Sequence, residues 1–559
     1  MQSQRLLTES SEGDWSNQHV FRAGDKPLLR TDSVWTLPEY HEALALVEFY
    51  FDICIATYRI LHKPTVEQWL LVAEHNRSGR LPVFHGLSNA KGAALLAVLA
   101  IARYVQLTID GSADEHDSIS QSDCLMRESF RLIDHESGMA SLESIQARLV
   151  QVFYCLMSCR FNHAWYVFGN CLQLIAAMNL QRRSSDADRS RSADYLAGQH
   201  RKRIFWSAYI LDRYLGVVLG RPPHFHDEDI DQEYPDCVND EDMFPEGPRL
   251  NRSEDCQVDA FIFNAKIARI VGTASRCVYG IHPSTESDRL AAISRLGIQI
   301  DEWHASLPPF LSTVKPSSLI RCLRRQSNAL KLAHCHALMH TYRPLLLGNG
   351  TRQRRQSTTA LIDDGLSRCI KAAQTVLEAS SAGAKEGGAT GPAFWWTHYV
   401  TFCALAVVYV WILQRRRNVL QRRSDVEDAK LLELAETCQH QLATTTVTNS
   451  LSRKYSFILE ELRMKARKPG AHAQTVTTEQ QSMPYALTVA PPLSGGMALH
   501  SPPATQPSMV NMPTQPSISS MSLMDTPDWI NDWKNTDWLD LDASVSLTVY
   551  PSRTLLTYV

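Results

Sequence analysis

The sequence has no excess of positive charge. Its 559 residues carry 56 Lys and Arg against 59 Asp and Glu, and the pI is near 6.7. A chain that binds DNA by itself usually presents a strong positive potential, so the balance argues against the phosphate backbone as the main ligand. Apolar residues make up 44% of the chain, which is enough for a large core in two or three domains and excludes a wholly disordered or fibrous protein.

The sequence also lacks a secretory signal peptide and closely paired cysteines. No basic stretch followed by an apolar one opens the chain, and the 13 cysteines are scattered singly. These features predict a reducing compartment, the cytoplasm or nucleus. Residues 393–413 contain no Asp, Glu, Lys or Arg and would span about 30 Å as a helix. His398 and two threonines within this run favour a buried core helix, so we expect no contact with a membrane.

Alternating strand patterns are missing, whereas apolar residues recur at helical spacing. Clear i, i+3, i+4, i+7 stripes begin at Leu46, Ile145 and Trp165. The pattern predicts an all-α fold, a multi-helix bundle of about a dozen helices. Further helices are expected over residues 90–108, 118–135, 258–280, 287–306, 318–342, 360–379, 393–416, 427–445 and 450–467.

Composition divides the chain into four segments. Residues 1–35 lack periodicity and are expected to form a disordered arm, and residues 36–469 form the helical body, interrupted by a loop at 380–392. Residues 470–524 are rich in Pro, Ser, Thr and Gln, which predicts a flexible linker. Residues 525–559 form a tail that opens with acidic and aromatic residues.

The central block, residues 200–231, predicts a helix that is apolar around nearly its whole circumference and therefore lies inside the bundle. Gly220 is suited to a left-handed C-terminal cap, and Pro222 and Pro223 prevent the helix from continuing. An acidic loop follows.

Two charged residues, Asp212 and Arg213, lie in the middle of this helix. A buried carboxylate needs a cation or several hydrogen-bond donors. We therefore expect Asp212 to pair with Arg221 or Arg203.

Three stretches of the chain closely resemble the fungal-specific transcription factor domain, the regulatory middle region of zinc-cluster activators. The stretches are Ile60-Leu61-His62-Lys63-Pro64-Thr65; Ala164-Trp165 with Gly169 and Asn179-Leu180; and Arg203-Ile204-Phe205-Trp206 with Asp212-Arg213, Gly220-Arg221-Pro222-Pro223 and Asp229-Ile230-Asp231. The resemblance covers roughly residues 36–380. It implies an all-helical regulatory domain in a nuclear regulator of transcription, controlling a small pathway such as a secondary-metabolite gene cluster. We expect structural importance for Arg203, Phe205, Trp206, Asp212, Arg221, Pro222 and Asp229.

Members of this family usually carry an N-terminal cluster in which six cysteines hold two zinc ions and present a helix to DNA. Here the first cysteine is Cys54, and no C-x2-C spacing occurs. Three alternatives stay open: the protein is a cofactor without direct DNA contact, it reaches DNA through a partner, or the sequence begins downstream of a lost exon.

The tail contains a candidate partner-binding segment. Residues 525–542 hold six Asp and one Lys interleaved with tryptophans. Like-charge repulsion keeps these apolar side chains solvated until a partner's groove binds them, which is typical of activation segments that contact the transcription machinery or co-regulators. The alternative is a C-terminal helix that docks on the bundle. The residues expected to bind are Asp528, Trp529, Asp532, Trp533, Asp537, Trp538, Leu539 and Leu541.

The body is expected to receive a signal from another protein, from a second copy in a homo- or heterodimer, or from a small metabolite between helices, and so to change the exposure of the tail. A cluster of arginines over residues 415–423 is interpreted as a solvated helix end, with nuclear import as the alternative.

No catalytic residue, metal site or cofactor is predicted. The acidic run from Asp227 to Asp231 suggests one alternative, a class I terpene cyclase-like enzyme with magnesium, but its carboxylates follow two prolines and include consecutive positions that face apart. His336 and His340, at i and i+4, lack the Glu of a metalloprotease motif and are interpreted as a surface pair. Cys155, Cys159 and His163 are interpreted as core thiols and a helix-end histidine, because i to i+8 along one helix rises about 12 Å and one zinc ion cannot bridge it.

Overall fold

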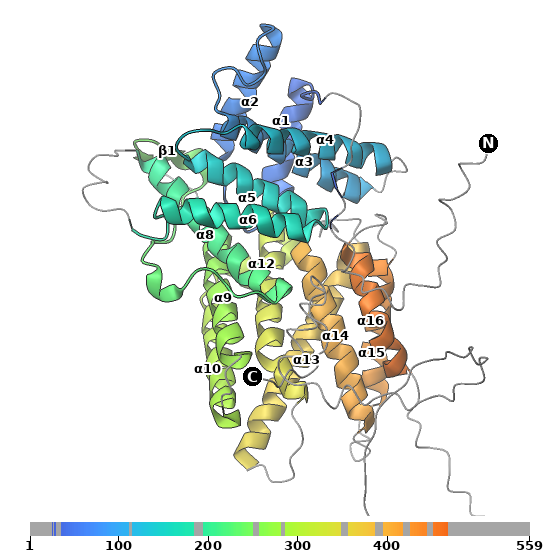
Figure 1. Cartoon of the computed structure of the whole chain (residues 1–559). Helices are drawn as coiled ribbons and strands as arrows, with labels where there is room; N and C mark the ends of the chain where they lie inside the picture. Colours follow the sequence, from blue (N-terminus) through green and yellow to red (C-terminus); the bar gives the residue numbers. More distant parts are fainter. Residues whose placement is uncertain are drawn as a thin grey trace, which may run out of the picture. The chain divides into compact units, whose positions relative to one another are not determined.

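The structure is a computed structural model (Figure 1). Its contacts divide the chain into one unit of Met1–Lys468 with Trp533–Val559 and a second of Pro469–Asp532. All described residues belong to the first unit, so the predicted linker and tail lie outside them, as does the arm apart from four residues. The structure describes residues 25, 27, 28, 35–110, 115–183, 194–249, 256–280, 285–347, 356–385, 395–417, 425–443 and 451–467.

The described residues are almost entirely helical, which confirms the all-α prediction. Strand occurs there only as an antiparallel pair of two-residue segments, β1 (Met243–Phe244) and β2 (Gly247–Pro248). The α-helices are α1 (Tyr40–Phe49), α2 (Lys63–Ser78), α3 (Asn89–Asp110), α4 (Glu115–Asp134), α5 (Leu142–Met157), α6 (Phe161–Ala177), α8 (Tyr195–Leu219), α9 (Gln257–Val278), α10 (Glu286–Ala305), α11 (Pro309–Ser312), α12 (Arg321–Tyr342), α13 (Gln356–Lys385), α14 (Trp395–Arg417), α15 (Asp425–Ala443) and α16 (Leu451–Arg467). Shorter helical turns are η1 (Tyr50–Cys54), η2 (Asp227–Asp229), η3 (Asp240–Asp242), η4 (Pro316–Ser318) and η5 (Arg343–Leu347).

Local sequence explains where several helices begin and end. Ser141 and Ser144 exchange hydrogen bonds in a capping box at the start of α5, and the Asp194 carboxylate accepts the Ala197 N–H at the start of α8. At the other end of α8, Gly220 adopts the left-handed conformation, with φ 60° and ψ 29°. The predicted cap is confirmed, because glycine alone has no Cβ penalty there.

The helices pack into two connected groups (Figure 1). In the first group α3, α4 and α5 pack against one another, and α5 also contacts α6. In the second group α14 packs against α13, α15 and α16. The helices α8, α9 and α12 link the groups, because α8 contacts α5 and α9, α9 contacts α12, and α12 contacts α13 and α14. The central helix α8 is therefore covered by other helices, as its apolar circumference predicts.

Two helices are long and apolar enough to cross a membrane by length and composition. They span Asn89–Ile109, within α3, and Trp395–Arg416, within α14, and their most apolar windows are 72% and 83% buried inside the protein. Most tryptophans and aliphatic residues of α14 are buried against neighbouring helices. For the run at 393–413, this burial agrees with the core-helix interpretation.

Two sequence predictions about local structure are wrong. The loop expected at 380–392 begins later, because α13 continues to Lys385; only Gly383 interrupts a run of small helix-tolerant residues there. The single helix assumed for Cys155, Cys159 and His163 is broken, since α5 ends at Met157 and Cys159 has a φ of 61°. Both cysteines are nonetheless buried core thiols, and His163 lies near the start of α6.

The prediction of a surface pair at His336 and His340 is also wrong. Both side chains are about 1% exposed. Their rings lie 5.6 Å apart, and the rings of Trp396 and Tyr399 on α14 cover His336 at 4.7 and 5.7 Å. Helical spacing alone does not show that these histidines are buried, because the residues that bury them come from another helix.

Candidate functional site

The three stretches of sequence that carry the family resemblance meet around one loop, residues 220–242, which follows α8. We call this segment the signature loop. Arg203 on α8 binds its far end: Nη1 donates to Oδ1 of Asp240 over 2.7 Å, and Nη2 donates to the Val238 carbonyl oxygen over 3.3 Å. Burial opposes ionisation of Asp240, yet the charges of Arg203 and Arg59 hold its pKa down at about 2. The ion pair is therefore intact at neutral pH.

Two residues of the early stretch, His62 and Lys63, bind the same aspartate. The backbone N–H of Lys63 donates to Oδ2 of Asp240 over 2.9 Å, and Nε2 of His62 donates to the Asp240 carbonyl oxygen over 2.9 Å. Asp240 thus joins α2 to α8. Sequence reasoning missed this residue, because it lies in a second acidic cluster with no periodic relation to Arg203.

Asp212 pairs with backbone donors, so the prediction that it pairs with Arg221 or Arg203 is wrong. Its carboxylate accepts the N–H of His224 at 2.9 Å and the N–H of Phe225 at 3.1 Å. Nδ1 of His224 also lies 3.1 Å from Oδ1. The reason is geometric: the left-handed turn at Gly220 folds the loop back onto α8, whereas Arg203 lies about 13 Å away along the helix.

Asp227 is the anchor in the middle of the signature loop. It accepts the hydroxyl of Tyr209 at 2.6 Å, and it binds Nη2 of Arg213 at 3.2 Å and Nη2 of Arg276 at 2.9 Å. Partial burial opposes its charge, but the hydrogen bonds from Tyr209 and Arg276 and the neighbouring cations lower the pKa of Asp227 below its usual value. Because Arg276 belongs to α9, this carboxylate ties the loop to two helices.

Phe205 and Trp206, the two aromatic residues expected to be structurally important, contact the inner side of the signature loop. Nε1 of Trp206 donates to the Glu233 carbonyl oxygen over 2.8 Å, and the Trp206 ring stacks on Tyr234 with centroids 4.3 Å apart. Phe205 packs edge-to-face on Phe225 at 5.4 Å. Both Phe205 and Trp206 are buried.

The stretch that contains Trp165 contacts the start of the signature loop. The guanidinium of Arg221 lies 4.5 Å from the ring centroid of Trp165 on α6, a cation–π contact that replaces the predicted pairing with Asp212. Pro222 and Asp229, the other two predicted residues, have exposed side chains on the outside of the loop. Five of the seven residues therefore join the network, and two do not.

The acidic run shows no arrangement for metal chemistry. Asp227 is occupied by arginines, and Asp231 pairs with Arg182 at 3.2 Å and accepts the N–H of Arg183 at 2.7 Å. Within the described ranges, no group of three or more His, Cys, Asp or Glu residues could hold a metal ion. Carboxylates already matched to cations in a surface loop do not fit a magnesium-diphosphate site, so the geometry argues against the cyclase alternative. The network holds a loop in place.

Comparisons with known proteins agree with this description. Residues 47–305 match the family model of the fungal specific transcription factor domain. The chain is 26% identical over 282 residues to the transcriptional regulatory protein YJL206C of Saccharomyces cerevisiae, covering 49% of this chain and 36% of that protein. It is 22% identical over 498 residues to the transcriptional activator protein acu-15 of Neurospora crassa, covering 86% of this chain and 48% of that protein. No solved structure matches the chain significantly.

Residues 47–305, a little under half of the chain, are similar to the fungal specific transcription factor domain. The relatives are named as regulators or activators of transcription or of stress genes. The chain spans less than half the length of the two relatives named above.

Proposed function

We propose that the chain acts in the nucleus as a transcriptional regulator of a small set of pathway genes, such as a secondary-metabolite gene cluster. The observation that carries the proposal is the match of residues 47–305 to the regulatory domain. The relatives named as a regulatory protein and an activator support it. In this proposal DNA contact comes through a partner protein or through a DNA-binding module outside the given sequence.

The helical body and the tail have different roles in the proposal. The buried ion pairs of the signature loop suit a rigid scaffold, since a buried charge that keeps its partner fixes the position of the elements that carry it, and breaking the pair is costly. The partner-binding segment of the tail, residues 525–542, recruits the transcription machinery or a co-regulator through tryptophans among aspartates. A homo- or heterodimer of the body is the partner arrangement that we expect.

A reporter assay tests the tail directly. The full chain is fused to a heterologous DNA-binding domain, and Trp529, Trp533 and Trp538 are replaced together by Ala. Buried interface tryptophans typically contribute about 2 kcal/mol each, so we expect reporter activation to fall at least about tenfold. Deletion of residues 484–501 of the predicted linker serves as a control outside the partner-binding segment, and we expect it to leave activation unchanged.

The outcomes separate the alternatives. Loss of activation at unchanged protein level and unchanged helix content supports the activation segment. Activation that survives the triple substitution would overturn it. Loss of solubility would instead support a tail helix docked on the bundle.

A further inference from the structure

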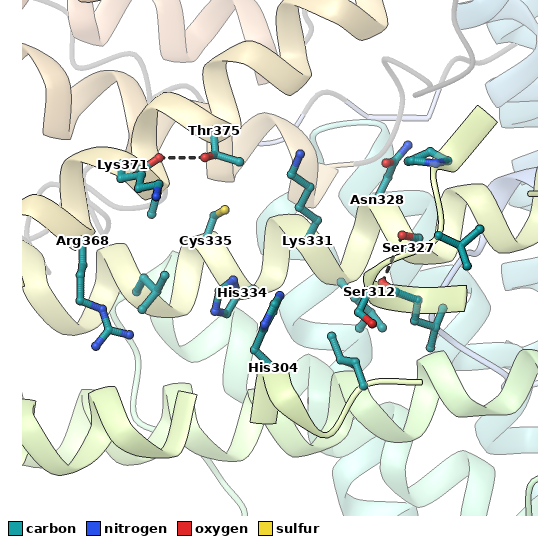
Figure 2. Close-up of a pocket in the computed structure, with 17 residues that line it drawn as sticks. His304, Ser312, Ser327, Asn328, Lys331, His334, Cys335, Arg368, Lys371 and Thr375 are labelled. Carbon is teal, nitrogen blue, oxygen red and sulfur yellow. Dashed lines mark hydrogen bonds between the residues drawn. The ribbon is translucent and has the colours of Figure 1, made fainter. Parts of the chain in front are cut away.

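A pocket of about 470 Å³ lies between α12, α13 and the segment that connects α10 to α12 (Figure 2). This volume is within the range of small-molecule sites. The signature loop contributes nothing to its lining. The apolar side chains that line the pocket are Leu307, Leu311, Val314, Leu330 and Leu338, with Pro316 and Ala372.

The charged and imidazole side chains that line the pocket are all basic. Lys331 and His334 belong to α12, Arg368 and Lys371 to α13, and His304 to the end of α10. The lining contains no Asp or Glu. Cations around a low-dielectric wall concentrate the field inside a cleft and attract anions.

The two lysines are available for a ligand. Lys331 and Lys371 are exposed, and neither forms an ion pair within the part of the chain that the structure describes. Arg368 is already bound to Asp301 and to the Tyr342 hydroxyl. Figure 2 shows Lys331 and Lys371 on the α12–α13 side of the pocket, while His304 and His334 lie close to each other on the α10 side.

His334 adds a neutral polar group. Its Nε2 is buried without a hydrogen-bond partner in the described residues, and its ring lies 4.5 Å from that of His304. Burial and the nearby His304 lower the pKa of His334 to about 4, so the ring is neutral at pH 7. A buried polar atom without a partner is costly, and the neutral ring adds no charge to the two lysines.

We propose that this pocket binds a small organic anion with an apolar body. The anionic group lies against Lys331 and Lys371, and the apolar body covers the leucines of α12 and of the segment that connects α10 to α12. Any effect of this ligand on transcription rests on the proposed function. Binding itself does not, so the two are tested separately.

The test uses two fluorescent probes that differ by one group. 1-Anilinonaphthalene-8-sulfonate is an anion with an apolar body, and N-phenyl-1-naphthylamine is the same body without the sulfonate. In titrations of the full chain we expect the double variant Lys331→Ala, Lys371→Ala to weaken sulfonate binding at least about tenfold, equivalent to about 1.4 kcal/mol. Binding of the neutral probe should change less than about twofold, because the apolar surface is intact.

Three further variants test whether the change in probe binding is specific to the pocket. Lys430→Ala removes an exposed lysine of α15 that does not line the pocket, and we expect no change for either probe. Thr375→Trp fills the pocket from a half-buried position, and both probes should lose binding while circular dichroism stays unchanged. Deletion of residues 525–542 should leave both affinities unchanged.

The proposal is overturned if the double lysine variant weakens both probes equally or neither. It is also overturned if deleting residues 525–542 tightens binding many-fold, because the pocket would then hold the tail. Neither result depends on the reporter assay. Failure of transcriptional activation with intact probe binding would reject the proposed function alone.

Discussion

At the scale of single residues, the ion pair of Arg203 with Asp240 is the interaction of the signature loop whose loss we expect to cost the most stability. Replacing Arg203 by Met would leave the buried carboxylate without its main cation. We expect the free energy of unfolding to fall by about 3–5 kcal/mol, measured by urea denaturation followed by circular dichroism. The control Arg182→Met breaks the exposed pair with Asp231 and should cost less than about 1 kcal/mol.

A second variant isolates the cause. Arg203→Met combined with Asp240→Leu removes both partners, and part of the lost stability should return because no unpaired charge stays buried. Equal stability of Arg203→Met and Arg182→Met would contradict the role of this pair.

Single residues also show where sequence reasoning stops. The burial of Asp212 follows from the apolar helix around it, but its partners do not, since the donors at His224 and Phe225 depend on the path of the chain after Gly220. No pattern in the sequence marks Asp240 as the partner of Arg203. Helical spacing describes one helix at a time, whereas these contacts join elements far apart along the chain.

At the scale of elements, two helical glycines are expected to respond to alanine with opposite signs. A Cβ at Gly272 of α9 would lie 2.7 Å from Cδ of the buried Arg213, whereas a Cβ at Gly169 of α6 would meet nothing within 4 Å. We expect Gly272→Ala to destabilise the protein by about 1–3 kcal/mol through overpacking. Gly169→Ala should stabilise it by up to about 1 kcal/mol through helix propensity. Thermal unfolding of both variants checks the signs, and stabilisation by Gly272→Ala would show that Arg213 moves aside freely.

The sequence predicted the limits of helices better than it predicted the contacts between them. Expected and observed helix limits agree to within a few residues for α3, α9, α10 and α12, because the apolar period, the caps and the prolines act locally. The continuation of α13 to Lys385 was missed, since Ser, Ala and Gly neither favour nor forbid a helix strongly. The pocket was also missed, because its lining comes from three helices and a connecting segment.

At the scale of the whole molecule, buried neutral histidines predict that the folded body loses stability in mild acid. Burial and the charge of Arg343 lower the pKa of His336 to about 3, and both its ring nitrogens are without hydrogen-bond partners in the described part of the chain. The groups that face it are Arg343, His340, Tyr214 and Tyr399. Because the unfolded chain takes up the proton near pH 6.5, stability is complete above that pH and falls as pH decreases toward 3.

At pH 4.5 the loss from His336 alone is about 3 kcal/mol, at 1.36 kcal/mol per pH unit. The variant His336→Leu should therefore flatten the dependence of unfolding free energy on pH between 6.5 and 4.5. The same replacement at the exposed His75 serves as the control. Parallel pH profiles for His336→Leu and the parent would refute this assignment.

The position of α12 has a practical consequence for anyone dividing this protein into fragments. The family match stops at residue 305, yet α12 begins at Arg321 and packs against α9 on one side and α13 and α14 on the other. A fragment that ended with the match would leave the inner surface of α9 facing water and would invite aggregation. Residue 467, at the end of α16, is a natural place to cut.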